Sequence, residues 1–258
     1  MTRIKTIARK LCKDWYDKAP YMALSGDFAI ETVDQAYEAQ LELQRLYSRN
    51  RGSVVGRKIA LSSRAMQEMV GIDHPIAGAF FSHDLHHSPA KIRLDNFQHL
   101  GLEFELALEL KTDVLPQDKP HTPKTVRGLV ASARPAFELI EDRSADYSDL
   151  DPLTLIADNA WCGGVVLGQE IDNWENRDPG DIASLVHQDG EPVELANTGA
   201  ADPLGSLAWV LDHFSGRGMA LSKGEYVITG SAVRTRFPIV GDKFTYEVAG
   251  ATASIEIC

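Results

Sequence analysis

The stretch GLEFELALEL, residues 101–110, alternates strictly between apolar side chains and others. Because successive side chains of a β-strand point to opposite faces, its leucines and Phe104 share one face. Glu103, Glu105 and Glu109 share the opposite face. The alternation predicts a strand and leaves two interpretations of the glutamates open. They are either a solvated outer face, which is the more common case, or carboxylates that bind a ligand.

A further glutamate, Glu138, stands within the apolar run of residues 135–140. A buried anion without a partner is costly, so Glu138 needs a partner if this run is buried. Glu103 and Glu105, two positions apart, would lie roughly 6–7 Å apart along a strand. Carboxylates that converge from two strands repel each other unless a cation lies between them. Mg²⁺ and Mn²⁺ prefer such oxygen ligands, so a metal site is the alternative to a solvated face.

The composition excludes several classes of protein. The 258 residues carry a formal net charge of −11, which argues against nucleic acid or an anionic membrane surface as the main partner. No apolar run reaches the roughly 20 residues that span a bilayer, and the N-terminal residues are amphipathic, unlike a signal peptide. Three cysteines without a CxxC pair indicate reduced thiols, as expected of a cytoplasmic protein.

The periodicity of the apolar residues divides the chain into two parts. Apolar residues recur at helical spacing through the first fifty residues, and at every second position, as in a β-strand, after Gly52. We therefore expect a helical N-terminal region, residues 1–55, and a β-rich body, residues 56–258. The expected strands are 55–61, 77–82, 91–97, 102–110, 135–141, 164–171, 182–186, 226–229, 244–248 and 253–257. The expected helices of the body are one at 63–70 and three that begin at Thr122-Pro123, Asp151-Pro152 and Asp202-Pro203.

Lys58 is the next candidate. Its neighbours on the same strand face are Gly56 and Ala60, which leave room for a ligand. A lysine in such a groove could bind a carboxylate, or transfer protons if burial lowers its pKa. The alternative is an ordinary surface lysine on an edge strand.

Asp84 lies among His83, His86 and His87. Three histidines so close suggest a transition-metal site, but the pair four residues apart would need a helix to share one face. The following Ser88-Pro89 and the flanking strands favour a polar loop instead. No GxSxG, phosphate loop, dinucleotide fingerprint or HExxH motif occurs, which argues against nucleotide cofactors and a serine hydrolase.

Eight motifs occur in one order over most of the chain. They are AYEAQ (36–40), VGRKIALSSRAMQ (55–67), GIDHP (71–75), the strand with Glu103 and Glu105, RPAFE (134–138), IADNA (156–160), VLG (166–168) and GS (230–231). Each motif is weak alone, but together the chain resembles the 2-keto-4-pentenoate hydratase and 4-oxalocrotonate decarboxylase group of the fumarylacetoacetate hydrolase superfamily.

The resemblance implies an α+β fold with a distorted mixed β-barrel or β-roll body, a helical N-terminal region and a homo-oligomer. It implies that Glu103, Glu105 and Glu138 hold Mg²⁺ or Mn²⁺. It also implies that Lys58 and Asp84 transfer protons or bind the substrate carboxylate.

The implied substrate is a small 2-oxo or 2-hydroxydienoic acid from the breakdown of aromatic compounds. Asn159 and Ser231, in matching motifs, are the candidate substrate-binding residues; the alternatives are a helix cap or turn for Asn159 and an ordinary loop for Gly230-Ser231. Arg234 joins them because it could pair with a distal carboxylate, which would favour a diacid. The alternative for Arg234, and the more common case, is an ordinary exposed arginine.

The expected activity is a metal-dependent hydratase, a lyase that converts a 2-hydroxy-2,4-dienoate to a 4-hydroxy-2-oxo acid. A 4-oxalocrotonate-type decarboxylase and an acylpyruvate hydrolase remain alternatives, because all three reactions share a stabilised enolate.

The chain departs from the group at Trp161-Cys162, where small hydroxyl residues are usual, and at the histidines beside Asp84. Trp161 could close the pocket, reshape it or pack in the core. A further alternative is therefore an inactive partner subunit in a hydratase–decarboxylase complex.

Overall fold

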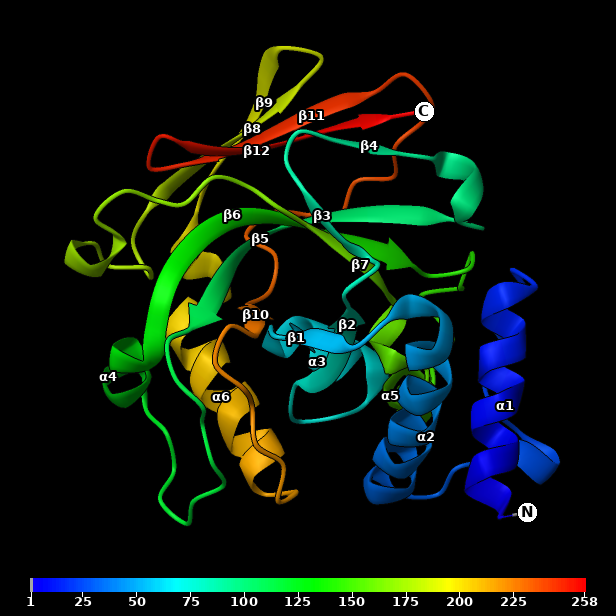
Figure 1. Ribbon diagram of the computed structural model, residues 1–258. Helices are drawn as coiled ribbons and strands as arrows, with labels where there is room; N and C mark the ends of the chain where they lie inside the picture. Colours follow the sequence, from blue (N-terminus) through cyan, green and yellow to red (C-terminus); the bar gives the residue numbers. More distant parts are fainter. Residues whose placement is uncertain (1) are drawn as a thin grey trace.

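One strongly curved sheet of seven strands dominates the computed structural model, which describes residues 2–258. Its strands are β1 (Val54–Ala60), β2 (Ile76–Phe81), β3 (Leu85–His87), β5 (Leu100–Leu110), β6 (Val130–Glu141), β7 (Cys162–Leu167) and β10 (Tyr226–Ile228). They lie in the order β2-β1-β10-β5-β6-β7-β3. The long strands β5 and β6 sweep around the middle of the molecule, so that one face of the sheet becomes the inside of a partial barrel (Figure 1).

A second sheet of five strands packs over the outside of the curve (Figure 1). Its strands are β4 (Ala90–Ile92), β8 (Ala183–Gln188), β9 (Glu191–Asn197), β11 (Lys243–Val248) and β12 (Ala251–Ile257). Phe104 of β5 contacts Phe244 and Tyr246 of this sheet, with ring centroids 6.2 and 5.7 Å apart. The apolar face of β5 is therefore covered by the second sheet, and its glutamates point into the curve.

The helices gather mainly on the side of the molecule away from the second sheet (Figure 1). They are α1 (Arg3–Tyr16), α2 (Val33–Arg51), α3 (Arg64–Val70), α4 (Pro123–Val126), α5 (Pro152–Ala157) and α6 (Pro203–Ser215). The expected caps are confirmed, because Thr122, Asp151 and Asp202 each accept a hydrogen bond from the backbone N–H three residues on. The mixed helices and strands, the curled sheet and the N-terminal helices confirm the expected fold class.

The helix α2 is joined to the body by a polar residue of its buried stripe. The Gln40 amide donates hydrogen bonds to the carbonyls of Ala77 and Ile156, at 2.8 and 2.7 Å. Burial of Gln40 is therefore compensated, which explains a polar side chain within an otherwise apolar stripe.

Three expectations about the strands are wrong. Residues 85–87, expected in a loop, form β3 because they pair in parallel with β7, a long-range contact that local sequence does not reveal. The strand expected over 91–97 is only Ala90–Ile92, followed by a single 3₁₀ turn. The strand β9 was not expected, because most of its side chains are exposed and no apolar face marks it.

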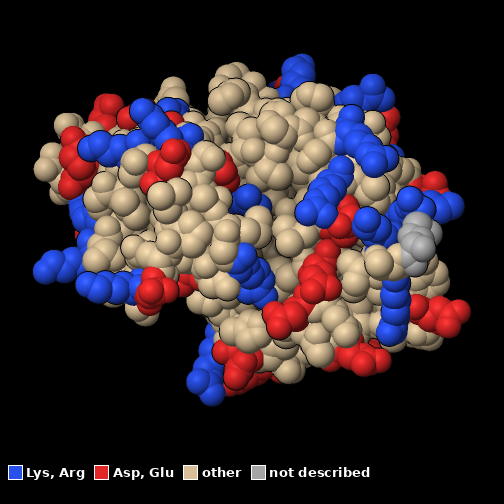
Figure 2. Space-filling model, turned by 60° about the horizontal axis from the view of Figure 1, so that its bottom comes forward, with Lys and Arg blue, Asp and Glu red and all other residues tan. Residues whose placement is uncertain are grey.

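The other global expectations concern charge, thiols and membranes. Cys12, Cys162 and Cys258 are free thiols. Basic and acidic side chains lie scattered among each other on the face in Figure 2, not in one basic region. Over residues 2–258, no helix combines the length and apolarity that crossing a bilayer requires.

Candidate active site

Three glutamates from two neighbouring strands converge inside the curved sheet. Glu103 and Glu105 stand on β5, and Glu138 lies directly opposite Glu103 on β6. One carboxylate oxygen of each lies within 4.8 Å of the others. Glu105 and Glu138 are fully buried, whereas Glu103 is partly exposed. The structure thus brings together the three residues expected to form the metal site. The solvated-face alternative is wrong for Glu105, which is fully buried.

The electrostatics of this cluster call for a positive charge. Burial, followed by repulsion from Glu138 and Glu103, raises the pKa of Glu105 well above its ordinary value. Glu105 Oε2 accepts a hydrogen bond from the Gly230 N–H at 2.6 Å. Within residues 2–258, no group donates to its buried Oε1. Glu138 Oε2 is likewise buried without a hydrogen-bond donor in the described part of the chain. Carboxylate oxygens left unpaired in this way fit a hard divalent cation.

The Gly230 N–H can approach Glu105 only because the residue is a glycine. Gly230 has a φ of +96°, and a Cβ atom there would lie 2.8 Å from the Ser62 hydroxyl. A larger residue would strain the backbone and collide with Ser62. The Gly-Ser pair of the sequence is therefore a support of the carboxylate cluster as well as a loop.

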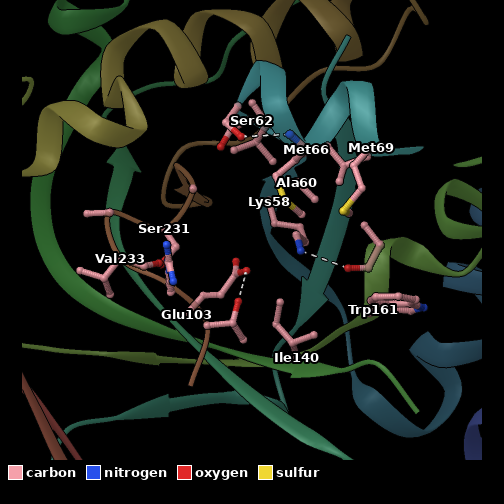
Figure 3. A pocket seen from close by; sticks show the side chains of 18 of the residues that line it. Lys58, Ala60, Ser62, Met66, Met69, Glu103, Ile140, Trp161, Ser231 and Val233 are labelled. Atoms are coloured by element: carbon pink, nitrogen blue, oxygen red, sulfur yellow. Dashed lines mark hydrogen bonds between the residues drawn. The ribbon is translucent and has the colours of Figure 1, made fainter. Parts of the chain in front are cut away.

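Lys58 reaches the same cluster from β1. Its side chain is 1% exposed, so the surface-lysine alternative is wrong. Lys58 Nζ lies 2.8 Å from Glu138 Oε1 and donates a hydrogen bond to the Ala160 carbonyl at 3.0 Å. Burial is the largest single influence and disfavours the charged amine, but the attractions of Glu138, Cys162 and Glu103 together outweigh it, so the pKa of Lys58 is raised. Lys58 is therefore an ammonium held between a carboxylate and a carbonyl, and Figure 3 shows its hydrogen bond to the carbonyl.

The Ala160 carbonyl is presented by an unusual turn. Asn159, Ala160 and Trp161 all have positive φ, of 56°, 48° and 59°. Such a conformation is costly for residues with a Cβ atom and persists only when the surroundings enforce it. The turn also lies close to β2, where a Cβ atom on Gly78 would be 2.7 Å from the Asn159 carbonyl.

The Asn159 side chain holds this turn and does not line the cavity. Its Oδ1 accepts hydrogen bonds from the Ala79 N–H at 2.9 Å and from Gln44 Nε2 at 3.0 Å. Its Nδ2 donates to the Ala79 carbonyl at 2.8 Å. Since Asn159 is also 1% exposed, its geometry supports a positioning role more than the expected contact with substrate.

A cavity of about 600 Å³ opens above Glu103 and Lys58. Figure 3 shows Ser231 and Val233 on one wall and Trp161 with Met69 on the other. The lining comprises Lys58, Ile59, Ala60, Leu61, Ser62, Ser63, Met66, Met69, Glu103, Ile140, Tyr147, Leu150, Leu155, Ala160, Trp161, Glu194, Ala200 and residues 230–235. Its size suits a small molecule, and its residues combine a charged floor with largely apolar walls.

Two expected substrate-binding residues line this cavity. Ser231 Oγ accepts a hydrogen bond from the Phe104 N–H at 2.9 Å and donates one to the Val233 carbonyl at 2.8 Å. The Ser231 hydroxyl thus ties the loop after β10 to β5. Arg234, in the same loop, is exposed.

Trp161 does not fill the cavity. Its indole is 5% exposed and packs edge-on against Tyr21 and Tyr147, with ring centroids 5.2 and 5.9 Å apart. The bulky residue is therefore part of an aromatic wall, and the space above Lys58 stays open.

Asp84 does not join the other site residues. Asp84 Oδ2 pairs with Arg51 Nε at 2.6 Å, and both residues line a separate cavity of about 350 Å³. Arg51 also donates hydrogen bonds to the carbonyls of Cys162 and Gly163, so the pair fixes the start of β7. The histidines beside Asp84 form no cluster of metal ligands over residues 2–258.

Sequence reasoning missed two contributors to the site. Thr235 Oγ1 donates a hydrogen bond to Glu103 Oε1 at 3.0 Å, and the Ala160 carbonyl fixes Lys58. No sequence signal marks Thr235. The motif around Asn159 did point to the turn, but positive φ at alanine and tryptophan is rare and could not be expected.

Comparisons with known proteins agree with this geometry. The chain is 32% identical over 198 residues, 76% of its length, to a 2-keto-4-pentenoate hydratase of Burkholderia vietnamiensis, of which 74% is covered. It is 30% identical to a namesake from Paraburkholderia xenovorans, over 94% of this chain and 90% of that one. No family model matches the chain.

Solved structures share the fold. A 4-oxalocrotonate decarboxylase from Pseudomonas putida G7, complexed with magnesium and adipate, superimposes with a TM-score of 0.90 at 22% identity. The match covers 100% of this chain and 99% of that one. A fumarylpyruvate hydrolase from Pseudomonas aeruginosa, in complex with Mn²⁺ and pyruvate, has a TM-score of 0.58 at 14% identity, covering 78% and 88% of the two chains. The solved structures share the fold, and the two hydratase relatives show that the chain belongs to the 2-keto-4-pentenoate hydratase family of enzymes.

Proposed function

We propose that the protein is a divalent-metal-dependent hydratase that adds water to a 2-hydroxy-2,4-dienoate and forms a 4-hydroxy-2-oxo acid. The observation that carries the proposal is the cluster of Glu103, Glu105 and Glu138, with Lys58 against it, at the floor of a cavity. Hydratases of 2-keto-4-pentenoate and of 2-hydroxyhexa-2,4-dienoate among the relatives support this reaction class.

Glu103, Glu105 and Glu138 would hold the cation, which we propose to be Mg²⁺ or Mn²⁺. When bound, such an ion supplies Lewis acidity and stabilises negative charge on a 2-oxo acid or its enolate. The complexes of related structures with magnesium, calcium and Mn²⁺ support this choice of metal. Thr235 and Gly230 would keep the carboxylates oriented through their hydrogen bonds to Glu103 and Glu105.

Lys58 would move the proton. Its ammonium can deliver a proton to C5 of the dienol, and the resulting neutral amine takes up the hydroxyl proton from the oxygen at C2 as the ketone forms. Water then adds to the remaining conjugated double bond, with its hydroxyl on C4 and its proton on C3. The Ala160 carbonyl holds Lys58 Nζ in place during these steps, and the apolar walls limit the access of other water.

A decarboxylase is the second candidate. The TM-score of 0.90 with a 4-oxalocrotonate decarboxylase supports it, since that match covers the whole chain. That reaction would release CO₂ from a 2-oxohex-3-enedioate and leave a 2-hydroxypenta-2,4-dienoate, using the same floor of the cavity. An acylpyruvate hydrolase has weaker support, because the fumarylpyruvate hydrolase matches only in fold.

The inactive-subunit alternative loses its main support. It rested on Trp161, whose ring packs edge-on against Tyr21 and Tyr147 in the cavity wall. Glu103 and Lys58 still line the open cavity. We infer that the chain is itself an active enzyme.

We further infer a homo-oligomer in the cytoplasm. Leu195, Ile239 and Val240 are 76, 68 and 64% exposed, and side chains of this kind are commonly covered by another subunit. The free thiols support a reducing compartment.

The test is product analysis after incubation of the metal-loaded protein with two substrates in turn. We expect 2-hydroxypenta-2,4-dienoate to yield 4-hydroxy-2-oxopentanoate. Release of CO₂ from 2-oxohex-3-enedioate without any hydration of the dienoate would favour the decarboxylase instead. Turnover of neither substrate would overturn both.

A further inference from the structure

We propose that Arg234 forms a subsite for a second carboxylate, so that the preferred substrate is a dicarboxylic 2-oxo or 2-hydroxydienoic acid. This inference rests on the proposed function and specifies the substrate of the same cavity. It concerns the end of the substrate that does not react.

The cavity has two cationic side chains in its lining, Lys58 and Arg234. Lys58 is engaged at the floor, where Glu138 and the Ala160 carbonyl hold it. Arg234 forms no ion pair or hydrogen bond within the described part of the chain. Glu194 also lines the cavity, but it pairs with Arg236. An unpaired guanidinium is thus left facing a small-molecule cavity, where it offers paired donors that match a carboxylate.

The backbone that carries Arg234 is fixed relative to the reaction centre. On one side of it, the Ser231 hydroxyl binds the Phe104 backbone. On the other side, Thr235 donates to Glu103, and Arg236 exchanges two backbone hydrogen bonds with Leu102, at 2.8 and 3.0 Å. These hydrogen bonds fix the backbone on both sides of Arg234 and so limit the positions that its guanidinium can sample. Fewer positions lower the entropic cost of binding a carboxylate.

Arg234 differs from the residues at the reacting end of the cavity in its exposure to solvent. Glu105 and Glu138 are fully buried at the floor, whereas Arg234 is exposed. The guanidinium therefore lies toward the mouth, away from the buried ligands of a cation that would repel it. A substrate whose oxo-acid end lies on the floor would extend its other end toward the mouth.

The walls suit the middle of such a substrate. Figure 3 shows Met66, Ile140 and Trp161 on different sides of the cavity that Lys58 and Glu103 also line. These side chains offer no charge, so they can pack against a short carbon chain. A charged floor, an apolar middle and a cation near the mouth together match a molecule with a carboxylate at each end.

The experiment measures competitive inhibition by 2-oxoadipate and by 2-oxohexanoate, which have equal chain length and differ only in the second carboxylate. Wild-type protein loaded with Mg²⁺ should bind 2-oxoadipate more tightly. In Arg234→Met, which keeps an apolar stem, binding of 2-oxoadipate should weaken roughly tenfold, and binding of 2-oxohexanoate should change little. Arg234→Lys should recover part of the difference.

A matched control is Arg93→Gln, which removes one positive charge outside this cavity, at a residue paired with Asp95. It should leave both inhibition constants unchanged. Equal weakening of both inhibitors in Arg234→Met would assign Arg234 to the reacting carboxylate and overturn the proposal. So would unchanged binding of both.

The results distinguish an error in the proposed function from an error in the proposed subsite. If the wild-type protein turns over no dienoate, the function is wrong. If it turns over the dienoate and Arg234→Met keeps its discrimination between the two inhibitors, only the subsite is wrong.

Discussion

Lys58 Nζ lies 2.8 Å from Glu138 Oε1, although β10 and β5 separate their strands in the sheet. Three steps at about 4.8 Å each would place β1 and β6 roughly 14 Å apart in a flat sheet. The two side chains meet because the sheet curls and its inner face becomes concave (Figure 1). The curvature of the sheet therefore creates the site, since it brings a cation and three carboxylates from three strands together.

Replacing Lys58 tests this pairing. In Lys58→Met, we expect turnover to fall below detection, because the variant lacks the ammonium that would deliver the proton. The metal-free variant should also be less stable by about 3–5 kcal/mol, since Glu138 loses its partner in a buried site. Denaturant unfolding with and without Mg²⁺ would measure this loss. The metal should restore part of the stability in the variant, and full activity of the variant would contradict the account.

Asn159 is predicted to act through the position of Lys58. Asn159→Ala removes three hydrogen bonds that hold the left-handed turn, so kcat should drop about tenfold or more with a small change in KM. The loss of stability should be about 1–3 kcal/mol. The exposed Asn176→Ala serves as a control and should change neither quantity. A large rise in KM with unchanged kcat would instead support a direct contact between Asn159 and the substrate.

Asp84 is predicted to support the structure rather than the reaction. Asp84→Asn weakens the pair with the buried Arg51, so unfolding should require less denaturant. Because Asp84 lines a different cavity, kcat and KM of the folded variant should stay within about twofold of the wild type. A hundredfold loss of kcat without a change in stability would instead support a catalytic role for Asp84.

His213 predicts how stability depends on pH. Burial, with smaller contributions from Arg217, His74 and Arg57, lowers the pKa of His213 to about 3. The unfolded chain then binds a proton below about pH 6.5 that the folded protein does not, so stability falls as the pH falls below that value. At pH 4.5 this contribution reaches at most about 2.7 kcal/mol. The loss of stability from pH 7 to pH 4.5 should therefore be smaller in His213→Gln. An identical loss in both proteins would show that His213 does not contribute.

Much of the site was predictable because its residues lie in regular strands. The alternation of residues 101–110 places Glu103 and Glu105 on one face, and a buried Glu138 needs a partner whatever the fold. The identity of that partner was not predictable. Lys58 meets Glu138 only through the curl of the sheet, which depends on long-range packing and leaves no periodic signal in the sequence.

The errors have a common physical origin as well. Residues 85–87 become a strand through pairing with β7, and this pairing points Asp84 toward Arg51 and the second cavity. Local composition could show only a polar segment with three histidines. The sequence motif that contains Asn159 does mark a part of the site. The side-chain amide of Asn159, however, forms hydrogen bonds with the backbone of Ala79 in β2, and these contacts depend on the tertiary fold.

The measurement that tests the central claim most directly is the rate of 2-hydroxypenta-2,4-dienoate consumption, followed by ultraviolet absorbance. Chelator-treated wild-type protein and Glu105→Gln would be titrated with Mg²⁺ or Mn²⁺. We predict no activity without metal, saturable recovery in the wild type, and no recovery in Glu105→Gln at the same metal concentrations. Turnover that survives removal of the metal, or full recovery in Glu105→Gln, would contradict a metal site built from Glu103, Glu105 and Glu138.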